Sequence, residues 1–215
     1  MGASLLLCTQ RKWVTLMAKE TGNRPETQAQ RDKRLQEIIL LIALHSEGDE
    51  PFGAVKLNKL LFYADFLSYV KFGESITGQE YQALPQGPAP RRIVPVIRKM
   101  IEKEVLAIRE NDYYGKNQQR AFALDTPDTT EFASEQIELV KRVIKRFWGK
   151  NATEMSLISH RFIGWKISRI GETIPYSVAL VGSRPPTLAE KKRGLRLDKL
   201  AKECLHGSES RRRIA

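Results

Sequence analysis

Cysteine and histidine are scarce in this chain, and their positions exclude the common metal sites. The 215 residues contain two cysteines, Cys8 and Cys204, and three histidines, His45, His160 and His206. No CxxC pair, HExxH motif or Cys/His cluster occurs, whereas a zinc site needs three or four converging ligands. Two cysteines near opposite ends are also too few for a disulfide framework. We therefore expect unpaired thiols in a reducing cytoplasm, no metal ion and no cofactor.

Motifs that carry catalysis are missing as well. The chain has no GxxxxGK[S/T] phosphate-binding loop, no GxGxxG and no GxSxG nucleophile elbow. Ser159-His160 is the pair closest to a catalytic arrangement, but neighbouring side chains of a helix point about 100° apart. A lone histidine more often anchors a loop by hydrogen bonds. We expect that structural role for His160, and we expect a protein that is not an enzyme.

Long apolar runs are lacking too, which argues against a membrane span. The longest candidates, residues 38–45 (IILLIALH) and 60–67 (LLFYADFL), fall well short of the roughly 20 apolar residues that a membrane helix requires. Hydrophobic residues make up 41% of the chain, which suits one ordinary globular core. We expect no membrane partner.

Positive charge is abundant, but it is concentrated at the two ends. Of the net charge of +11, residues 1–31 contribute +3 and residues 187–215 contribute +5. We predict a disordered or weakly ordered extension over residues 1–31, a folded domain over residues 32–184 and a basic, partly helical extension over residues 185–215. Such ends bind nucleic-acid phosphates weakly and without sequence preference, or they only keep the protein soluble.

Hydrophobic periodicity predicts helices over most of the domain. One helix begins at Asp32, a residue suited to the N-cap, and runs to about Ser46. The next runs from about Ala54 to Phe72 and ends at Gly73; it has so few polar positions that we expect it at the centre of the domain. Later helices are predicted from a cap at Ser134 to about Gly149, after a cap at Thr153, and over residues 188–204.

The segment YQALPQGPAPRR, residues 81–92, predicts a rigid elbow after the central helix. Pro88 and Pro90 fix their own backbone φ and disfavour helix in the residue before them. A further helix follows, either from Ala89 with a distortion at Pro95 or from Pro95 itself.

Alternating apolar and polar residues after that helix predict one β-hairpin. Its strands would be residues 105–110 and 120–125, joined by a polar loop over residues 111–119. Together the elements predict an α+β fold, a mostly helical compact domain with a small antiparallel hairpin or sheet.

The order of elements leaves a DNA-binding function open. Two helices, a third helix after the elbow and then a hairpin follow the order of a winged helix, as in a DNA-binding transcriptional regulator. Arg91, Arg92, Arg98 and Lys99 would then lie on or near the recognition helix. That segment offers no Asn or Gln to read base edges, and its proline disturbs the helix.

Several motifs, taken as a set, resemble the Panacea domain, also called the SocA-like antitoxin domain. They are KLNKLLFYADF (56–66), ITG followed by Tyr81 (76–81), the elbow GPAP (87–90) and LISHRFIGW (157–165). The resemblance would cover about residues 32–180. It implies a mostly helical α+β domain and a bacterial or phage antitoxin that neutralises a cognate toxin by direct contact. One type of relative acts as an adaptor that presents its toxin to a protease, such as a Clp-type machine.

The resemblance implies no catalytic residues and directs attention to the central helix and the elbow. We expect the partner-binding residues to be Lys59, Tyr63, Gln86, Gly87, Pro88, Arg91 and Arg92. The motif residues with structural roles are Leu57, Leu60, Leu61, His160 and Trp165. The two arginines are expected to reach a partner without supporting the core.

One departure from the family pattern lies between the third helix and the hairpin. Many relatives carry a glycine at this turn, whereas this chain reads EKEVLAI over residues 102–108.

Overall fold

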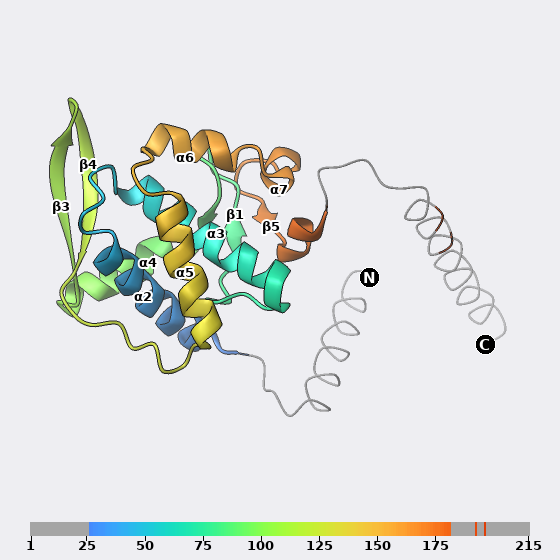
Figure 1. The fold of residues 1–215 in the computed structure, drawn as a ribbon, viewed down its shortest axis with the longest axis horizontal. Coiled ribbons are helices and arrows are strands. Elements are labelled where there is room, and N and C mark those ends of the chain that lie inside the picture. The colour runs from blue at the N-terminus through green and yellow to red at the C-terminus, as the bar shows by residue number, and fades with distance from the viewer. Residues whose placement is uncertain (1–25, 182–191, 193–195, 197–215) are drawn as a thin grey trace, which may run out of the picture. The chain divides into compact units, whose positions relative to one another are not determined.

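The computed structural model describes residues 26–181, 192 and 196, and the first of two compact units ends at Ala179. Its helices are α2 (Gln28–His45), α3 (Ala54–Phe72), α4 (Ile93–Glu102), α5 (Ser134–Arg146), α6 (Ala152–Ser159) and α7 (Ile163–Ile167). Two small antiparallel sheets and a 3-10 helix, η1 (Tyr176–Leu180), complete it (Figure 1). This is the predicted α+β architecture. The predicted helix over residues 188–204 lies outside the described residues, apart from residues 192 and 196.

Helix α3 lies at the centre of the domain, as its composition predicted (Figure 1). It packs against α2, α5, α6 and strand β2 (Ala89–Pro90), so that both polar and apolar side chains on it are buried. Gly73 ends the helix with φ +83°, and its N–H donates to the carbonyl oxygen of Tyr69. The predicted bounds of this helix, Ala54 and Phe72, are confirmed.

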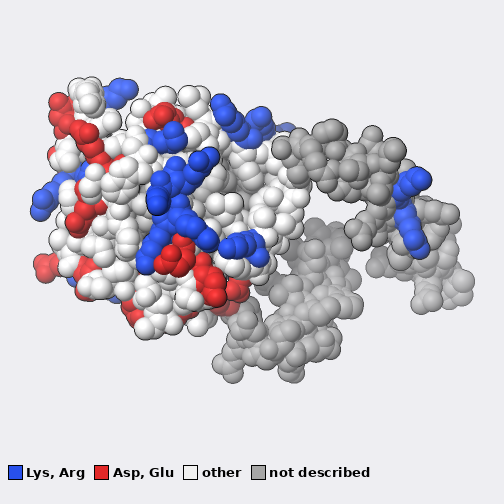
Figure 2. All heavy atoms as spheres, in the orientation of Figure 1, with Lys and Arg blue, Asp and Glu red and all other residues white. Residues whose placement is uncertain are grey.

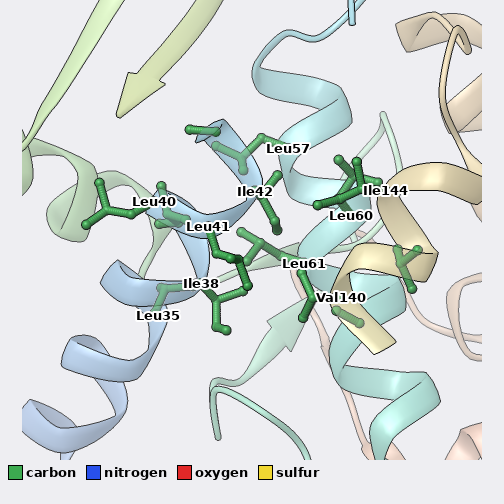
Figure 3. Packing of buried hydrophobic residues seen from close by; sticks show 14 of the residues in the cluster. Leu35, Ile38, Leu40, Leu41, Ile42, Leu57, Leu60, Leu61, Val140 and Ile144 are labelled. Atoms are coloured by element: carbon green, nitrogen blue, oxygen red, sulfur yellow. The ribbon is translucent and has the colours of Figure 1, made fainter. Parts of the chain in front are cut away.

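The main hydrophobic core forms where α2, α3 and α5 face one another (Figure 3). Figure 3 shows Leu35, Ile38, Leu40, Leu41 and Ile42 of α2, Leu57, Leu60 and Leu61 of α3, and Val140 and Ile144 of α5. Each of these side chains is at most 4% exposed. The motif leucines of α3 are therefore core residues.

Three predicted helix N-caps are wrong. Helix α2 begins earlier than Asp32, because Thr27 accepts a hydrogen bond from the N–H of Gln30 and the Gln30 side chain accepts one from Thr27. Asp32 instead lies inside the helix. Ala133, not Ser134, is the N-cap of α5, and Asn151, not Thr153, caps α6 by accepting from the N–H of Glu154.

A second sheet escaped the sequence analysis because its strands have two residues each. Strand β1 (Tyr81–Gln82) pairs with β2 on one side and with β5 (Thr173–Ile174) on the other, in antiparallel register. Neither predicted start of the following helix is correct, because Ala89 belongs to β2 and the helix begins at Ile93, two residues before Pro95. Helix α4 begins at Ile93 and places Pro95 in its first turn, where a missing N–H breaks no helical hydrogen bond.

The hairpin is longer than predicted. Strands β3 (Leu106–Tyr113) and β4 (Lys116–Ala123) pair without interruption from Leu106 opposite Ala123 to Tyr113 opposite Lys116. The expected polar loop is therefore mostly strand. Tyr114 and Gly115 form the turn with φ +51° and +74°, the positive values that a two-residue hairpin turn requires.

Residues 102–108, which lack the glycine of the family pattern, contain a residue with a strained backbone. Glu104 has φ +57°, in the left-handed region that favours glycine. The chain therefore makes a left-handed turn here with a glutamate rather than a glycine.

A buried carboxylate explains why the motifs of α3 and of residues 76–81 occur together. Asp65 is 0% exposed and accepts hydrogen bonds from the N–H groups of Ile76 and Thr77, the Thr77 hydroxyl and the Tyr81 hydroxyl. Burial raises the pKa of the Asp65 carboxyl, although these hydrogen bonds act in the opposite direction. The bonds fix the chain that leaves α3 and place β1 against it, which positions the elbow.

None of the helices in the described part of the chain has the length and apolar character needed to cross a membrane.

Candidate functional site

The elbow loop, residues 84–89, is a tight turn that α3 supports from below. The N–H of Gly87 donates to the carbonyl oxygen of Leu84 over 2.8 Å, and Gly87 has φ +101°. Pro85 and Gln86 are exposed at the tip, whereas residues 87–89 are buried. The loop therefore presents a two-residue tip on a buried base.

Two side chains from distant parts of the sequence hold this base, and a third lies against it. Lys59 Nζ donates to the carbonyl oxygen of Pro88 over 3.0 Å, and Trp165 Nε1 donates to that of Leu84 over 2.9 Å. Ser159 lies so close that a Cβ added to Gly87 would collide with its Oγ and come within 2.8 Å of Lys59 Cε. Only glycine fits here, both for its backbone angle and for the space.

His160 supports the elbow by stacking rather than by the hydrogen bonds expected of it. Its ring lies parallel to that of Trp165, with centroids 3.8 Å apart and an interplanar angle of 14°. Its buried Nε2 has no hydrogen-bond partner among the described residues. Ser159 was missed as an elbow residue, and its place beside His160 in the LISH motif was the only signal for it.

The predicted partner-binding residues divide into a buried set and an exposed one. Lys59, Gly87 and Pro88 are buried, and Lys59 is only 2% exposed, so they shape the loop from within. Tyr63 is half-buried and packs on Phe147 in a tilted arrangement with ring centroids 4.7 Å apart, and burial raises its pKa to about 12. Gln86 points a polar side chain outward at the loop tip.

The two arginines after the elbow bind within the fold. Arg91 Nη2 donates to the carbonyl oxygen of Gly171 over 2.7 Å and to Thr173 Oγ1 over 2.9 Å, which ties β2 to β5. Arg92 pairs with Asp32 over 2.7 Å. We expected the two arginines to reach a partner without supporting the core. That expectation is wrong, because each side chain joins segments that are distant in the sequence. Their predicted role toward a partner rests on the exposed part of each side chain.

The carboxylate that pairs with Arg92 is held by several donors. Burial by itself raises the pKa of Asp32, but hydrogen bonds from Arg92, Gln28 and Gln79 outweigh it and lower the pKa. The ion pair therefore persists at neutral pH and fixes α2 to the start of α4.

A groove of about 820 Å³ lies beside the elbow tip. We call it the hairpin groove; Gln86, the hairpin tip and the first residues of α3 and α6 line it. Tyr113 and Tyr114 meet edge to face at its rim, and Tyr114 is 83% exposed. The lining includes Asn117, Gln118 and Gln119, so the groove combines exposed aromatic area with uncharged hydrogen-bonding groups.

A basic surface lies elsewhere on the domain. Helix α5 exposes Arg142, Lys145 and Arg146, and Figure 2 shows lysine and arginine side chains gathered over this helix. The half-buried Lys141 pairs with Glu138 over 3.1 Å. This surface is a second candidate for partner contacts.

The surface that a winged helix would turn toward DNA has mixed charge. Helix α4 exposes Arg98 and Lys99 together with the apolar Val94 and Ile101. The hairpin, which would be the wing, exposes Glu110 and Asp112 near Lys116, whereas DNA wings meet phosphates. Nothing in this geometry favours base readout.

We expect binding to double-stranded DNA to be weak, steeply dependent on salt and indifferent to sequence. The reason is that the net positive charge is concentrated at the chain ends, which gives Kd values of roughly 10⁻⁴–10⁻⁶ M at physiological salt. Fluorescence anisotropy with random and promoter duplexes at several salt concentrations measures this. Deleting residues 187–215 is the control and should weaken binding further. Tight, selective binding to one duplex would establish the regulator instead.

No group of three or more His, Cys, Asp or Glu residues that could hold a metal ion occurs in the part of the chain that the structure describes. The site therefore consists of a braced loop, exposed aromatic and amide side chains and a groove.

Comparison with known proteins assigns the chain to a family. No curated protein and no solved structure matches it. The sequence model of the family described as "Antitoxin SocA-like, Panacea domain" matches residues 57–166, just over half of the chain. The match begins in α3 and ends one residue after Trp165, so it spans the elbow and the side chains that hold it. The chain belongs to the SocA-like antitoxin family with the Panacea domain.

Proposed function

We propose that the chain neutralises a toxin protein by direct, non-catalytic contact through the elbow tip and the hairpin groove. The observation that carries the proposal is the bracing of the elbow. Lys59 and Trp165, far apart in sequence, hold its backbone, while the loop exposes its tip beside a groove of about 820 Å³. A backbone held in this way loses little conformational freedom on binding, which favours affinity.

The chemistry of the groove suits a protein segment. Tyrosine is enriched among the residues that dominate binding energy at protein interfaces, and Tyr114 is 83% exposed at the rim. The amides of Asn117, Gln118 and Gln119 supply donors and acceptors for a peptide backbone. A concave, aromatic-rimmed surface whose lining is mostly uncharged, with Lys116 as its one charged residue, is therefore matched to an extended or helical segment of the partner.

The direct test is co-expression with the product of the adjacent gene. The full chain should restore growth to cells that express the toxin and should co-purify with it. A toxin half-life that shortens only when the chain and a functional protease are both present would identify delivery to the protease. An unchanged half-life with restored growth would identify neutralisation by binding alone. Failure to restore growth or to co-purify would overturn the proposal.

Tyr114→Ala should weaken toxin binding by about tenfold without lowering stability. An exposed aromatic anchor contributes roughly 1–2 kcal/mol or more to an interface, and a side chain that is 83% exposed contributes little to folding. Isothermal titration calorimetry and thermal melting measure the two quantities. Val94→Ala is the matched control, because Val94 is 63% exposed on α4, outside the groove. If Arg142→Ala weakens binding and Tyr114→Ala does not, the toxin binds the α5 surface instead.

A further inference from the structure

A small pocket of about 250 Å³ lies between α3 and the elbow loop. We call it the elbow pocket; Val55, Asn58, Lys59, Gln86 and Gly87 are among the residues that line it. Val55 and Gln86 line both this pocket and the hairpin groove, so the two hollows are adjacent.

Lys59 is a buried cation whose charge the described part of the fold leaves unneutralised. Its ammonium makes one hydrogen bond, to the carbonyl oxygen of Pro88, although it carries three donors. None of the described carboxylates lies within ion-pair distance of it. Lys56, one turn earlier on α3, is buried to the same degree but pairs with Asp49 at 2.5 Å. The fold thus neutralises one buried lysine and leaves the next without a counter-ion.

The Lys59 side chain borders the elbow pocket, although it is only 2% exposed. Gly87 packs directly against it, since an added Cβ would lie 3.2 Å from Lys59 Nζ. Asn58, which also lines the pocket, has a buried Oδ1 for which the described residues supply no hydrogen-bond partner. Rotating the Asn58 amide by about 180° puts its NH₂ group where Oδ1 lay. Asn58 and Lys59 can then both donate to one incoming acceptor.

The energetics point in the same direction. Burial lowers the pKa of Lys59 to about 8, and no nearby charge opposes this. A lysine in this state destabilises the free protein when it is protonated, and an added negative charge relieves the penalty. Stability alone would favour an apolar residue at this position.

We propose that the elbow pocket binds a carboxylate group of the partner protein, with Lys59 as its counter-ion and Asn58 as a second donor. This inference rests on the proposed function, since it names the chemistry by which the toxin is recognised. The carboxylate belongs either to an Asp or Glu side chain or to the C-terminus of the partner, because both present the same acceptor atoms.

The first experiment needs no partner and uses acetate as the probe. Lysine side chains of the full chain are labelled with ¹³C at Cε, and Lys59 is identified by its absence in the Lys59→Met variant. Titration in acetate should raise the Lys59 midpoint by about half to one pH unit over titration in chloride at equal ionic strength. A rise of one unit means that acetate prefers the charged lysine about tenfold. Lys56 and an acetamide titration are the controls; a Lys59 midpoint that acetate leaves unchanged would overturn the proposal.

The second experiment uses the toxin. Lys59→Met should weaken toxin binding about 30-fold or more, because the toxin carboxylate then stays buried without a counter-ion. One Asp→Asn, Glu→Gln or C-terminal amide change in the toxin should cause the same loss, and it should add nothing in the Lys59→Met background. The identity of that change separates a side chain from the C-terminus. If the parent chain binds no toxin, the proposed function fails; if the Lys59→Met variant binds as tightly as the parent, only the carboxylate inference fails.

Discussion

Gly87→Ala should lower the melting temperature by about 10 °C and abolish toxin neutralisation. The backbone at φ +101° disfavours any side chain, and the new Cβ would meet Ser159 Oγ and Lys59 Cε. Overpacking of this kind typically costs about 1–3 kcal/mol, and the unfavourable φ adds about 1 kcal/mol. For a chain of this size, each kcal/mol corresponds to roughly 2–4 °C. Neutralisation should fail because the clash displaces the elbow tip.

Two further variants separate the contributions to this effect. Gly73→Ala is the matched control, since Gly73 has φ +83° but nothing within 4 Å of an added Cβ. It should cost only the backbone term, about 1 kcal/mol, and should leave binding unchanged. In a Ser159→Ala background, Gly87→Ala should regain part of its stability, because the oxygen that meets the new Cβ is gone. Equal losses for Gly87→Ala and Gly73→Ala in thermal melts would show that the close approach has no energetic weight.

The sequence predicted those features of the fold that local chemistry determines. The central helix was placed correctly because a dense apolar pattern begins after Gly53 and ends at a glycine that takes a left-handed conformation. The Gly-Pro elbow was recognised as rigid for the same kind of reason. In both places the signal lies in residues that are neighbours in the sequence.

Features that depend on distant pairing were missed or misplaced. Arg92 appears free beside the elbow in the sequence, but its partner, Asp32, lies sixty residues away. The three-stranded sheet joins pairs of residues that no periodicity can reveal. The hairpin turn was read as a loop because Tyr-Gly is a weaker turn signal than Asn-Gly.

The two lysines of α3 show how sharply environment divides similar residues. From the sequence, Lys56 and Lys59 fall on one stripe of the helix and appear equivalent. In the structure both are buried, but within the described ranges only Lys56 has a carboxylate partner. The partner-binding role predicted for Lys59 therefore stays a prediction, now for its charge at the base of a pocket rather than for an exposed side chain.

Replacing each lysine by methionine should change stability in opposite directions at neutral pH. Lys56→Met leaves Asp49 buried at 1% exposure without its ion-pair partner, which typically costs about 3–5 kcal/mol. Lys59→Met removes a buried charge whose pKa of about 8, against the usual 10.5 of a lysine, corresponds to a penalty of about 3 kcal/mol. It also breaks the bond to Pro88, which costs about 1–2 kcal/mol, so the net gain is about 1–2 kcal/mol.

The pH dependence of this difference provides the sharper measurement. Below pH 8 Lys59 is protonated in the folded and unfolded states, so the burial penalty acts in full against folding of the parent. Between pH 8 and about 10.5 the unfolded chain holds more protons than the folded one, so the contribution of Lys59 to stability rises with pH. Lys59→Met should therefore be more stable than the parent at pH 7 and less stable near pH 10.5, where only the lost hydrogen bond remains. Urea unfolding of both chains from pH 6.5 to 10.5 measures this, and other titrating groups cancel in the difference. A Lys59→Met variant that is less stable than the parent at pH 7 would contradict this prediction. It would mean that Lys59 stabilises the free fold, so its buried charge would carry no net penalty.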